Sequence, residues 1–322
     1  MKIGIITDSL QDMPFTEALD WVAGQGIQAV EIGTGNFSHG KHCDLENLVN
    51  DAGAREEFMG AIESRGLMLS ALNCNGNLLD PHPERGKSAQ DVFHKTVEAA
   101  GKLGLDTVVT MSGCPGEPNG CEYPNWVLHP WQKEYLDLYE WQWDKVMQPF
   151  WKQAGQFASD RGVKIAIEMH PGQSVYNTSS LLRLREIAGP SLGANLDPSH
   201  LFYQGMDPMV VIRTLGRDFI FHVHAKDTKI NSREMAVNGG LDLRPMSMVV
   251  DRSWTYRTLG FGHGADWWAD FLSELRLVGY DGVLSIEHED PVMSSKEGIV
   301  KSVEFLKPLV IKTMPEENLP WL

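Results

Sequence analysis

The chain has few cysteines and lacks long apolar runs. No uncharged apolar stretch approaches about 18 residues, so the sequence predicts no membrane span. The N-terminal segment lacks the basic and apolar regions of a signal peptide. The cysteines show no CxxC spacing, which argues against a zinc ribbon or a disulfide scaffold in a chain this long. We therefore expect a cytoplasmic protein with reduced thiols. The four cysteines are Cys43, Cys74, Cys114 and Cys121.

Positive charge is also scarce. The chain has 28 Lys and Arg against 43 Asp and Glu, which gives a formal net charge of −15 at pH 7. No cluster of Lys and Arg stands out. Because affinity for nucleic acid depends on Lys and Arg displacing counterions from phosphates, we expect no nucleic-acid partner.

Strand-like and helix-like segments alternate along the whole chain, which predicts an α/β fold with a parallel sheet. Eight strand-like segments favour a closed (β/α)8 TIM barrel over an open sheet. The length of 322 residues is usual for one such barrel, so we expect a single domain over residues 1–322. The expected strands are Lys2–Asp8, Ala29–Gly33, Met68–Asn73, Thr107–Ser112, Lys164–His170, Leu192–Asp197, Ile220–Lys226 and Val283–His288.

Two connections, after the fourth and seventh expected strands, are too long for simple turns. Residues Gly113–Tyr139 are rich in Gly, Pro and aromatics, and residues Thr228–Ala265 carry Arg257 and His263. Long loops at the rim of a barrel are usually lids or binding loops, so both side chains are predicted to contact a substrate. For either loop the alternative is a contact between subunits of a homo-oligomer. The glycines around His263 are equally compatible with a tight turn.

Four segments begin as aliphatic runs and become polar at their C-terminal ends. In a (β/α)8 barrel, the loops that leave the C-terminal ends of the strands build the active site. A polar residue at any one strand end is also compatible with a cap or a loop hydrogen bond. The coincidence of four such ends instead indicates a shared site. The segments are Lys164–His170 (KIAIEMH), Leu192–His200 (LGANLDPSH), Phe219–Asp227 (FIFHVHAKD) and Gly282–Asp290 (GVLSIEHED).

Period-two alternation selects one inward group from each segment. Three carboxylates and one imidazole result, an oxygen-rich set that suits Mn²⁺, Mg²⁺ or Co²⁺ better than a thiolate zinc site. Burying three carboxylates together is costly without a cation or basic partners. Lys226 is the obvious cationic residue on these strands. The predicted ligands are Glu168, Asp197, His224 and Glu287.

The motifs IEMH, NLDPSH, HVHAKD and SIEHED, in that order, resemble the xylose isomerase-like barrel enzymes. These are usually called sugar phosphate isomerases/epimerases, and the group includes ketose 3-epimerases and inosose dehydratases. The resemblance spans essentially the whole chain, from KIGIITDSL onward. It implies one divalent metal on the four ligands above, with Mn²⁺ first and Mg²⁺, Co²⁺ or Zn²⁺ as alternatives. It also implies that Glu168 and Glu287 transfer protons on opposite sides of a substrate.

Together these features predict a metal-dependent isomerase or epimerase of a keto-sugar or sugar derivative. The metal would stabilise the enediolate that forms when a proton leaves the carbon beside the carbonyl. The alternative is a lyase or dehydratase that eliminates a group from an inosose or a 3-keto-glycoside. Endonuclease IV-like repair enzymes share the barrel but use more zinc ligands and a basic surface, which the net charge disfavours. A non-enzymatic sugar-binding protein is the remaining alternative, and the four retained ligands argue against it.

Four further side chains are candidates for the site. His170 shares a strand face with Glu168 and is a competing base, because an ordinary pKa of ~6.5 suits proton transfer. The alternative is that it only forms a hydrogen bond with a substrate hydroxyl. His200, three residues after Asp197, is a substrate contact or a support for a ligand, with a structural role as the alternative. Lys226 binds a substrate oxygen or offsets the carboxylates. Asn73, at the end of the third strand, is predicted to bind a sugar hydroxyl.

Overall fold

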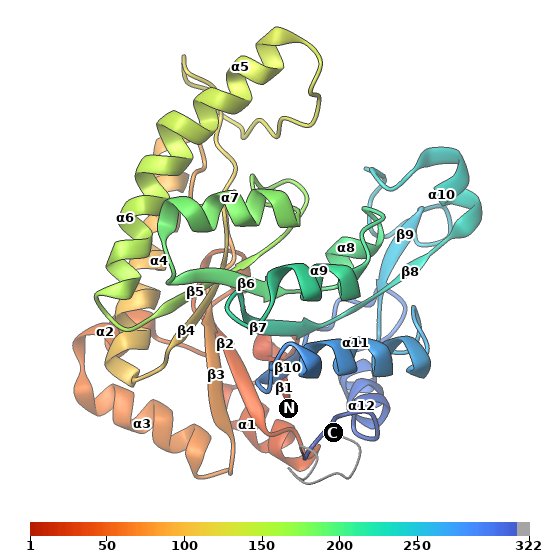
Figure 1. Cartoon of the computed structure of the whole chain (residues 1–322). Helices are drawn as coiled ribbons and strands as arrows, with labels where there is room; N and C mark the ends of the chain where they lie inside the picture. The colour runs from red at the N-terminus through yellow and green to blue at the C-terminus, as the bar shows by residue number, and fades with distance from the viewer. Residues whose placement is uncertain (314–322) are drawn as a thin grey trace, which may run out of the picture.

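The computed structural model describes residues 1–313 (Figure 1), so residues 314–322 of the expected domain lie outside the described part. Eight parallel strands close into a barrel in the order β1-β10-β7-β6-β5-β4-β3-β2. The predicted (β/α)8 barrel is therefore confirmed. Its strands are β1 (Lys2–Ile6), β2 (Ala29–Gly33), β3 (Met68–Asn73), β4 (Thr107–Met111), β5 (Lys164–Glu168), β6 (Leu192–Leu196), β7 (Ile220–Ala225) and β10 (Val283–Ile286).

The barrel strands form because their residues are aliphatic or small and can be buried on both faces. Every residue of β2, β4 and β6 is buried, as expected for parallel strands covered by helices. Gly193 in β6 lets the backbone of β7 approach closely, since a Cβ there would lie 2.4 Å from the Phe219 carbonyl oxygen. A larger residue at that position would push β6 away from β7, the two strands that lead to Asp197 and His224.

Helices surround the barrel on its outside (Figure 1). Their buried faces follow helical spacing, as in α4, where Phe93, Val97 and Ala100 are buried and the helix ends at Gly104 in the left-handed region. The α-helices are α1 (Phe15–Gly24), α2 (Leu45–Asn50), α3 (Ala52–Glu63), α4 (Pro83–Leu103), α5 (Lys133–Trp141), α6 (Gln148–Ser159), α7 (Thr178–Ala188), α8 (Ser199–Phe202), α9 (Pro208–Leu215), α10 (Ser232–Asn238), α11 (Ala265–Leu277) and α12 (Ser295–Leu306). Shorter turns are η1 (Thr7–Leu10), η2 (Asn36–Ser38) and the π-helical η3 (Gln142–Met147).

Buried aromatic side chains fasten the helices to the barrel. Trp151 of α6 is fully buried, and its indole nitrogen donates to the Ser112 carbonyl oxygen just beyond β4, at 3.1 Å. The ring packs edge-on against Phe93 of α4. Truncating a buried Trp or Phe typically costs about 3–5 kcal/mol, so this contact contributes strongly to keeping α4 and α6 against the β4 end of the barrel.

The two long connections contain regular structure and are not loops throughout. The segment after β4 becomes helical at α5, six residues before its expected end at Tyr139. The segment after β7 forms an antiparallel pair of strands, β8 (Asp227–Ile230) and β9 (Trp254–Arg257), together with α10. Alternating threonine, aromatic and aliphatic residues account for the pairing. Figure 1 shows both segments extending away from the body of the barrel.

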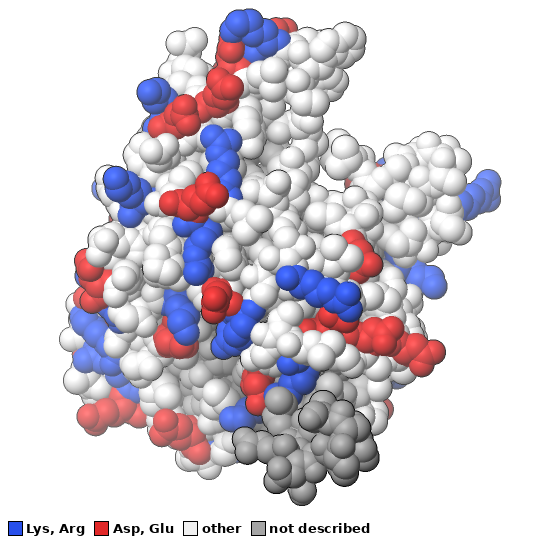
Figure 2. Space-filling view, in the orientation of Figure 1, with Lys and Arg blue, Asp and Glu red and all other residues white. Residues whose placement is uncertain are grey.

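The outer surface carries mixed charge. On the face shown in Figure 2, acidic and basic side chains are interspersed. The face in view therefore presents no continuous basic surface of the kind that binds nucleic acid.

Within residues 1–313, the structure contains no helix that is both long and apolar enough to cross a membrane.

Candidate metal centre

The structure brings the four predicted ligands together. Glu168 ends β5, Asp197 directly follows β6, His224 lies in β7 and Glu287 directly follows β10. These strands are consecutive neighbours in the barrel, so their carboxyl ends meet at one side of the rim. One donor atom from each residue lies within 4.8 Å of the others. Such a spacing allows all four atoms to reach a single ion.

Glu168 is held in place by three donors. Its Oε2 accepts from the side-chain nitrogens of Asn75 and Asn195, both at 3.0 Å, and its Oε1 accepts from Nε2 of His200 at 3.0 Å. Burial alone would raise the pKa of Glu168, but the hydrogen bond from His200 and the nearby charge of His224 hold it well below its usual value. The group is therefore an oriented, ionised carboxylate.

Asp197 and Glu287 supply the remaining oxygen atoms. Nε2 of His200 lies 3.1 Å from Oδ2 of Asp197, but its hydrogen bond goes to Glu168. Oδ2 of Asp197 is buried and accepts no hydrogen bond among the described residues. Oε2 of Glu287 lies 3.1 Å from both Nδ1 of His224 and Nζ of Lys226. A buried carboxylate oxygen without a donor is costly unless something positive binds it. The donor set therefore fits a divalent cation with hard oxygen ligands.

A cavity of about 520 Å³ opens beside this cluster, and two of the four proposed ligands, Glu168 and Glu287, line it, whereas Asp197 and His224 do not. Five of the predicted site residues line it: Glu168, His170, His200, Lys226 and Glu287. Several hydrogen-bonding side chains from the ends of other strands complete the wall. A cavity with a charged floor and many polar groups is suited to a small hydrophilic molecule.

Lys226 is tied to carboxylates on the next strand. Its Nζ lies 3.1 Å from Glu287, makes a close ion pair with Glu289, and sits 4.2 Å from the centre of the Tyr256 ring. Burial would lower the pKa of Lys226, but Glu287 and Glu289 raise it well above its usual value. Of the two roles open from the sequence, this geometry supports offsetting the carboxylates.

His170 lines the cavity with one ring nitrogen already committed. Its Nδ1 lies 2.6 Å from the Pro171 carbonyl oxygen, which can only accept, so Nδ1 carries the proton and Nε2 offers a lone pair. Burial and the neighbouring His200 lower the pKa of His170 to about 4, below the ordinary value assumed from the sequence. The imidazole is therefore neutral at pH 7, and its Nε2 can accept a hydrogen bond, but a pKa this low makes it a weaker base than an ordinary histidine.

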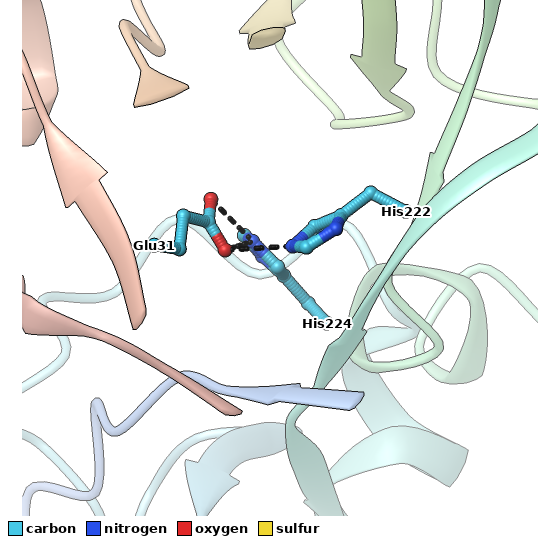
Figure 3. Close-up of side chains that lie close together, drawn as sticks. All are labelled: Glu31, His222 and His224. Carbon is cyan, nitrogen blue, oxygen red and sulfur yellow. Dashed lines mark hydrogen bonds and ion pairs between the residues drawn. The ribbon is translucent and has the colours of Figure 1, made fainter. Parts of the chain in front are cut away.

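Behind the four ligands lies a second acidic group, Glu31 of β2. Figure 3 shows the imidazoles of His222 and His224 meeting its carboxylate, and these three residues also bring possible ligand atoms within 4.8 Å. Burial opposes ionisation, but His224 and His222 hold the pKa of Glu31 well below its usual value. Asn73 donates to Glu31 at 2.7 Å and does not line the cavity, in contrast to its expected contact with a sugar hydroxyl.

The two candidates from the seventh connection also lie away from the cavity lining. Nδ1 of His263 lies 2.8 Å from Asp227, and the ring stacks on Phe202 at 3.9 Å between centroids. Arg257 forms an ion pair with Asp290 at 3.1 Å. Asp227 also accepts from three backbone amides of the glycine-rich segment, so the turn interpretation of that segment fits better than a substrate lid.

Sequence reasoning missed three neighbours of the site. Asp8 lines the cavity, and burial, with smaller effects from Glu31 and Glu287, raises its pKa to about 8. It lies just beyond β1, so the strand-end rule applied to all eight strands would have found it. Glu289 forms an ion pair with Lys226. Period-two alternation places Glu289 on the same face as Glu287, so the sequence did carry a signal for it. The Tyr256 hydroxyl, 3.0 Å from Nδ1 of His200, comes from β9 and had no signal in the sequence.

The fold and this donor set define a class of protein, a (β/α)8 barrel with a candidate metal centre at the carboxyl ends of its strands. Residues 19–309 match the sequence model of the xylose isomerase-like TIM barrel family. The chain belongs to that family. This agrees with the resemblance carried by the motifs of the last four strands.

Known relatives extend this finding. The chain is 42% identical over 310 residues to the uncharacterized protein YfiH of Bacillus subtilis, covering 95% of this chain and 98% of that protein. It shares its fold with the probable 3-DHS dehydratase AsbF of Bacillus anthracis (16% identity, TM-score 0.66, 95% and 99% coverage). It also shares its fold with an IolI protein with bound zinc (19% identity, TM-score 0.64, 96% and 98% coverage). A D-tagatose 3-epimerase-like protein has the same fold (21% identity, TM-score 0.62, 96% and 98% coverage). Solved structures that share this fold thus include an epimerase-like protein and a probable dehydratase.

Proposed function

We propose that the protein is a divalent-metal-dependent isomerase or epimerase of a keto-sugar or sugar derivative. The observation that carries this proposal is the convergence of donor atoms from Glu168, Asp197, His224 and Glu287 within 4.8 Å beside a polar cavity. A divalent cation held there would act as a Lewis acid toward a substrate carbonyl and its neighbouring hydroxyl. The oxygen-rich donors favour Mn²⁺, with Mg²⁺ and Co²⁺ as alternatives, and the zinc in the IolI structure keeps Zn²⁺ among them.

Two carboxylates and one imidazole are placed to move the proton. Glu168 is ionised and held by three donors, so it is an oriented base on the β5 side. Glu287 follows β10 and lines the cavity, so it is placed to return the proton to the substrate. His170 offers a neutral Nε2 at the cavity wall and is the competing base. Lys226 limits the repulsion between Glu287 and Glu289.

The charge of the cavity favours an uncharged substrate. Its described lining includes the carboxylates of Asp12, Glu168, Glu287 and Glu289, and its single lysine is already paired with carboxylates. A phosphate group would face like charges without an unpaired cationic side chain in that lining. Hydroxyls, in contrast, match the many side chains that can donate or accept hydrogen bonds.

A free ketose should therefore be used better than its phosphorylated form. With Mn²⁺-loaded protein, we expect kcat/KM for a ketose to exceed that of its 6-phosphate by about tenfold or more, which corresponds to about 1.4 kcal/mol. Product formation followed by NMR gives both values. A preference for the phosphorylated sugar would contradict the expectation and would point to a phosphate site outside this cavity.

The proposed chemistry requires loss of the hydrogen on the carbon beside the carbonyl. When ketoses, inososes and 3-keto-glycosides are incubated with Mn²⁺-loaded protein in D₂O, we expect deuterium at that carbon in the accepted substrate, detected by NMR. Protein carrying Asp197→Asn is the control and should not catalyse the exchange. Turnover that retains the hydrogen, with no isotope effect at that position, would rule out the proposed mechanism.

A second candidate is a lyase or dehydratase acting on an inosose or a 3-keto-glycoside. The observation that favours it is Asp8, a cavity carboxyl group that carries a proton at neutral pH because burial raises its pKa to about 8. Such a group can protonate a departing hydroxyl or glycosidic oxygen. Elimination produces an unsaturated carbonyl that absorbs ultraviolet light, whereas epimerisation does not, so the absorbance of the products separates the two reactions.

A further inference from the structure

We propose that Glu31 is a positioning residue that turns Nδ1 of His224 toward the candidate metal centre. This inference rests on the proposed metal site. It concerns a residue of β2 on the other side of His224 from the other three proposed ligands. Figure 3 shows the carboxylate of Glu31 with the rings of His222 and His224 directed at it.

The two nitrogens of His224 face different partners. Nε2 lies 3.1 Å from each oxygen of Glu31. A carboxylate oxygen can only accept, so the proton between them sits on Nε2. Nδ1 lies 3.1 Å from Oε2 of Glu287 and 3.4 Å from Oε2 of Glu168. Nδ1 also faces a carboxylate and can donate a proton to Glu287. A cation at the proposed ligand set would take the place of that proton and be bound through Nδ1, while Glu31 keeps the proton on Nε2.

Glu31 is itself fixed from three strands, which gives it the rigidity that this role needs. It is fully buried, and it accepts from Asn73 of β3 at 2.7 Å, from His222 of β7 at 2.9 Å and from Ser285 of β10 at 2.6 Å. The carboxylate therefore cannot rotate without breaking several buried hydrogen bonds. Each such loss costs about 1–3 kcal/mol.

The same hydrogen bonds favour support over a second ion at Glu31. Oε1 accepts from Asn73 and His224, and Oε2 accepts from His222, Ser285 and His224, so the donors already occupy the lone pairs of both oxygens. An ion there would also compete for His224, whose other nitrogen faces Glu168 and Glu287. A carboxylate that orients a histidine ligand is a recurrent arrangement, and losing it typically weakens metal binding or activity by 10- to 100-fold.

The test is the affinity for Mn²⁺ alone, measured by calorimetry on the full chain without substrate. Glu31→Gln keeps the shape of the side chain but removes its charge and one acceptor oxygen. We expect its Kd for Mn²⁺ to rise by about 10- to 100-fold. Glu274→Gln removes the same charge from α11, where Glu274 pairs with Arg213 on the surface, and is the matched control with unchanged Kd. An unchanged Kd in Glu31→Gln would overturn the inference.

Asp197→Asn, measured alongside, separates this inference from the proposed function. If wild-type protein binds Mn²⁺, Asp197→Asn does not, and Glu31→Gln binds as well as wild type, the metal site stands and the role of Glu31 is wrong. If wild-type protein binds no divalent ion, the proposed function and the inference both fail. Two ions in wild-type protein and one in Glu31→Gln would make Glu31 a ligand of a second ion and would also overturn the inference.

A measurement on wild-type protein avoids any folding defect of the variant. In protein loaded with diamagnetic Zn²⁺ and labelled with ¹⁵N at histidine, we expect the His224 ring to carry its proton on Nε2 and to bind the metal through Nδ1. Proton-coupled ¹⁵N shifts distinguish the two tautomers. A proton on Nδ1, or metal on Nε2, would show that Glu31 does not set the orientation of the ring.

Discussion

Replacing Asp197 with asparagine is expected to abolish both the binding of a divalent ion and turnover. Oδ2 of Asp197 is buried and accepts no hydrogen bond among the described residues, although Nε2 of His200 lies 3.1 Å away and Nζ of Lys226 4.0 Å away. This oxygen is therefore open to a cation that the other three ligands also reach. The change keeps the shape of the side chain but replaces an anionic oxygen with a neutral group. Calorimetry with Mn²⁺ and product formation by NMR should show both losses, while wild-type protein binds about one ion per chain.

Glu287→Gln should behave in the same way, because Glu287 supplies a second oxygen of the proposed set. Anomalous scattering from crystals soaked in Mn²⁺ gives an independent check of position. Density bounded by Glu168, Asp197, His224 and Glu287 is expected. Density between Glu31 and His222 would move the metal to the other cluster, and normal Mn²⁺ binding by Asp197→Asn would remove that residue from the ligand set.

The barrel was predictable because its strands combine aliphatic residues with turn signals at regular intervals. The bounds expected for β2 and β3 match the structure, whereas six strands end one or two residues earlier than expected. In each of those six, the chain leaves the sheet before the expected end of the strand, so that residues such as His170 lie beyond the carboxyl end of β5. Of the four proposed ligands, Asp197 and Glu287 directly follow their strands, whereas Glu168 and His224 still lie within theirs.

The four proposed ligands were predictable for a related reason. Alternation gives the face of a strand on which a side chain lies, and the parallel order of the strands brings their carboxyl ends together. The structure places their donor atoms within 4.8 Å of one another, and their roles stay a prediction. Alternation does not give depth along the barrel. His222 shares a face with His224, and both meet Glu31, but only His224 also reaches Glu168, Asp197 and Glu287.

Partners contributed by distant segments could not be predicted. Asn73 was expected at a sugar hydroxyl because it ends β3, yet the nearest strong acceptor is the carboxylate of Glu31. Arg257 and His263 were expected to contact a substrate, yet each meets a buried acidic residue, Asp290 or Asp227, and neither lines the cavity. A buried charge pairs with the closest opposite group, and only the folded chain shows which group that is.

Removing the imidazole of His170 should show whether this residue acts as a base or as a metal ligand. His170 lines the cavity, and its Nδ1 is committed to the Pro171 carbonyl oxygen, so the free Nε2 is available for a proton or a substrate hydroxyl. We expect His170→Ala to bind Mn²⁺ almost as wild-type protein does, while kcat falls by about 10²-fold or more, as is usual when a positioned base is lost. Calorimetry and single-turnover kinetics measure the two effects separately.

His263→Ala is the matched control for this experiment, because His263 sits on Asp227 and Phe202 away from the cavity lining and its loss should leave kcat within a few fold. If His170→Ala keeps nearly full activity, the proton goes to Glu168 or Glu287, as the resemblance to epimerases implies. If His170→Ala instead loses Mn²⁺, the choice of ligand on β5 is wrong. In that case His170 binds the metal, and Glu168, ionised and held by three donors, becomes the base.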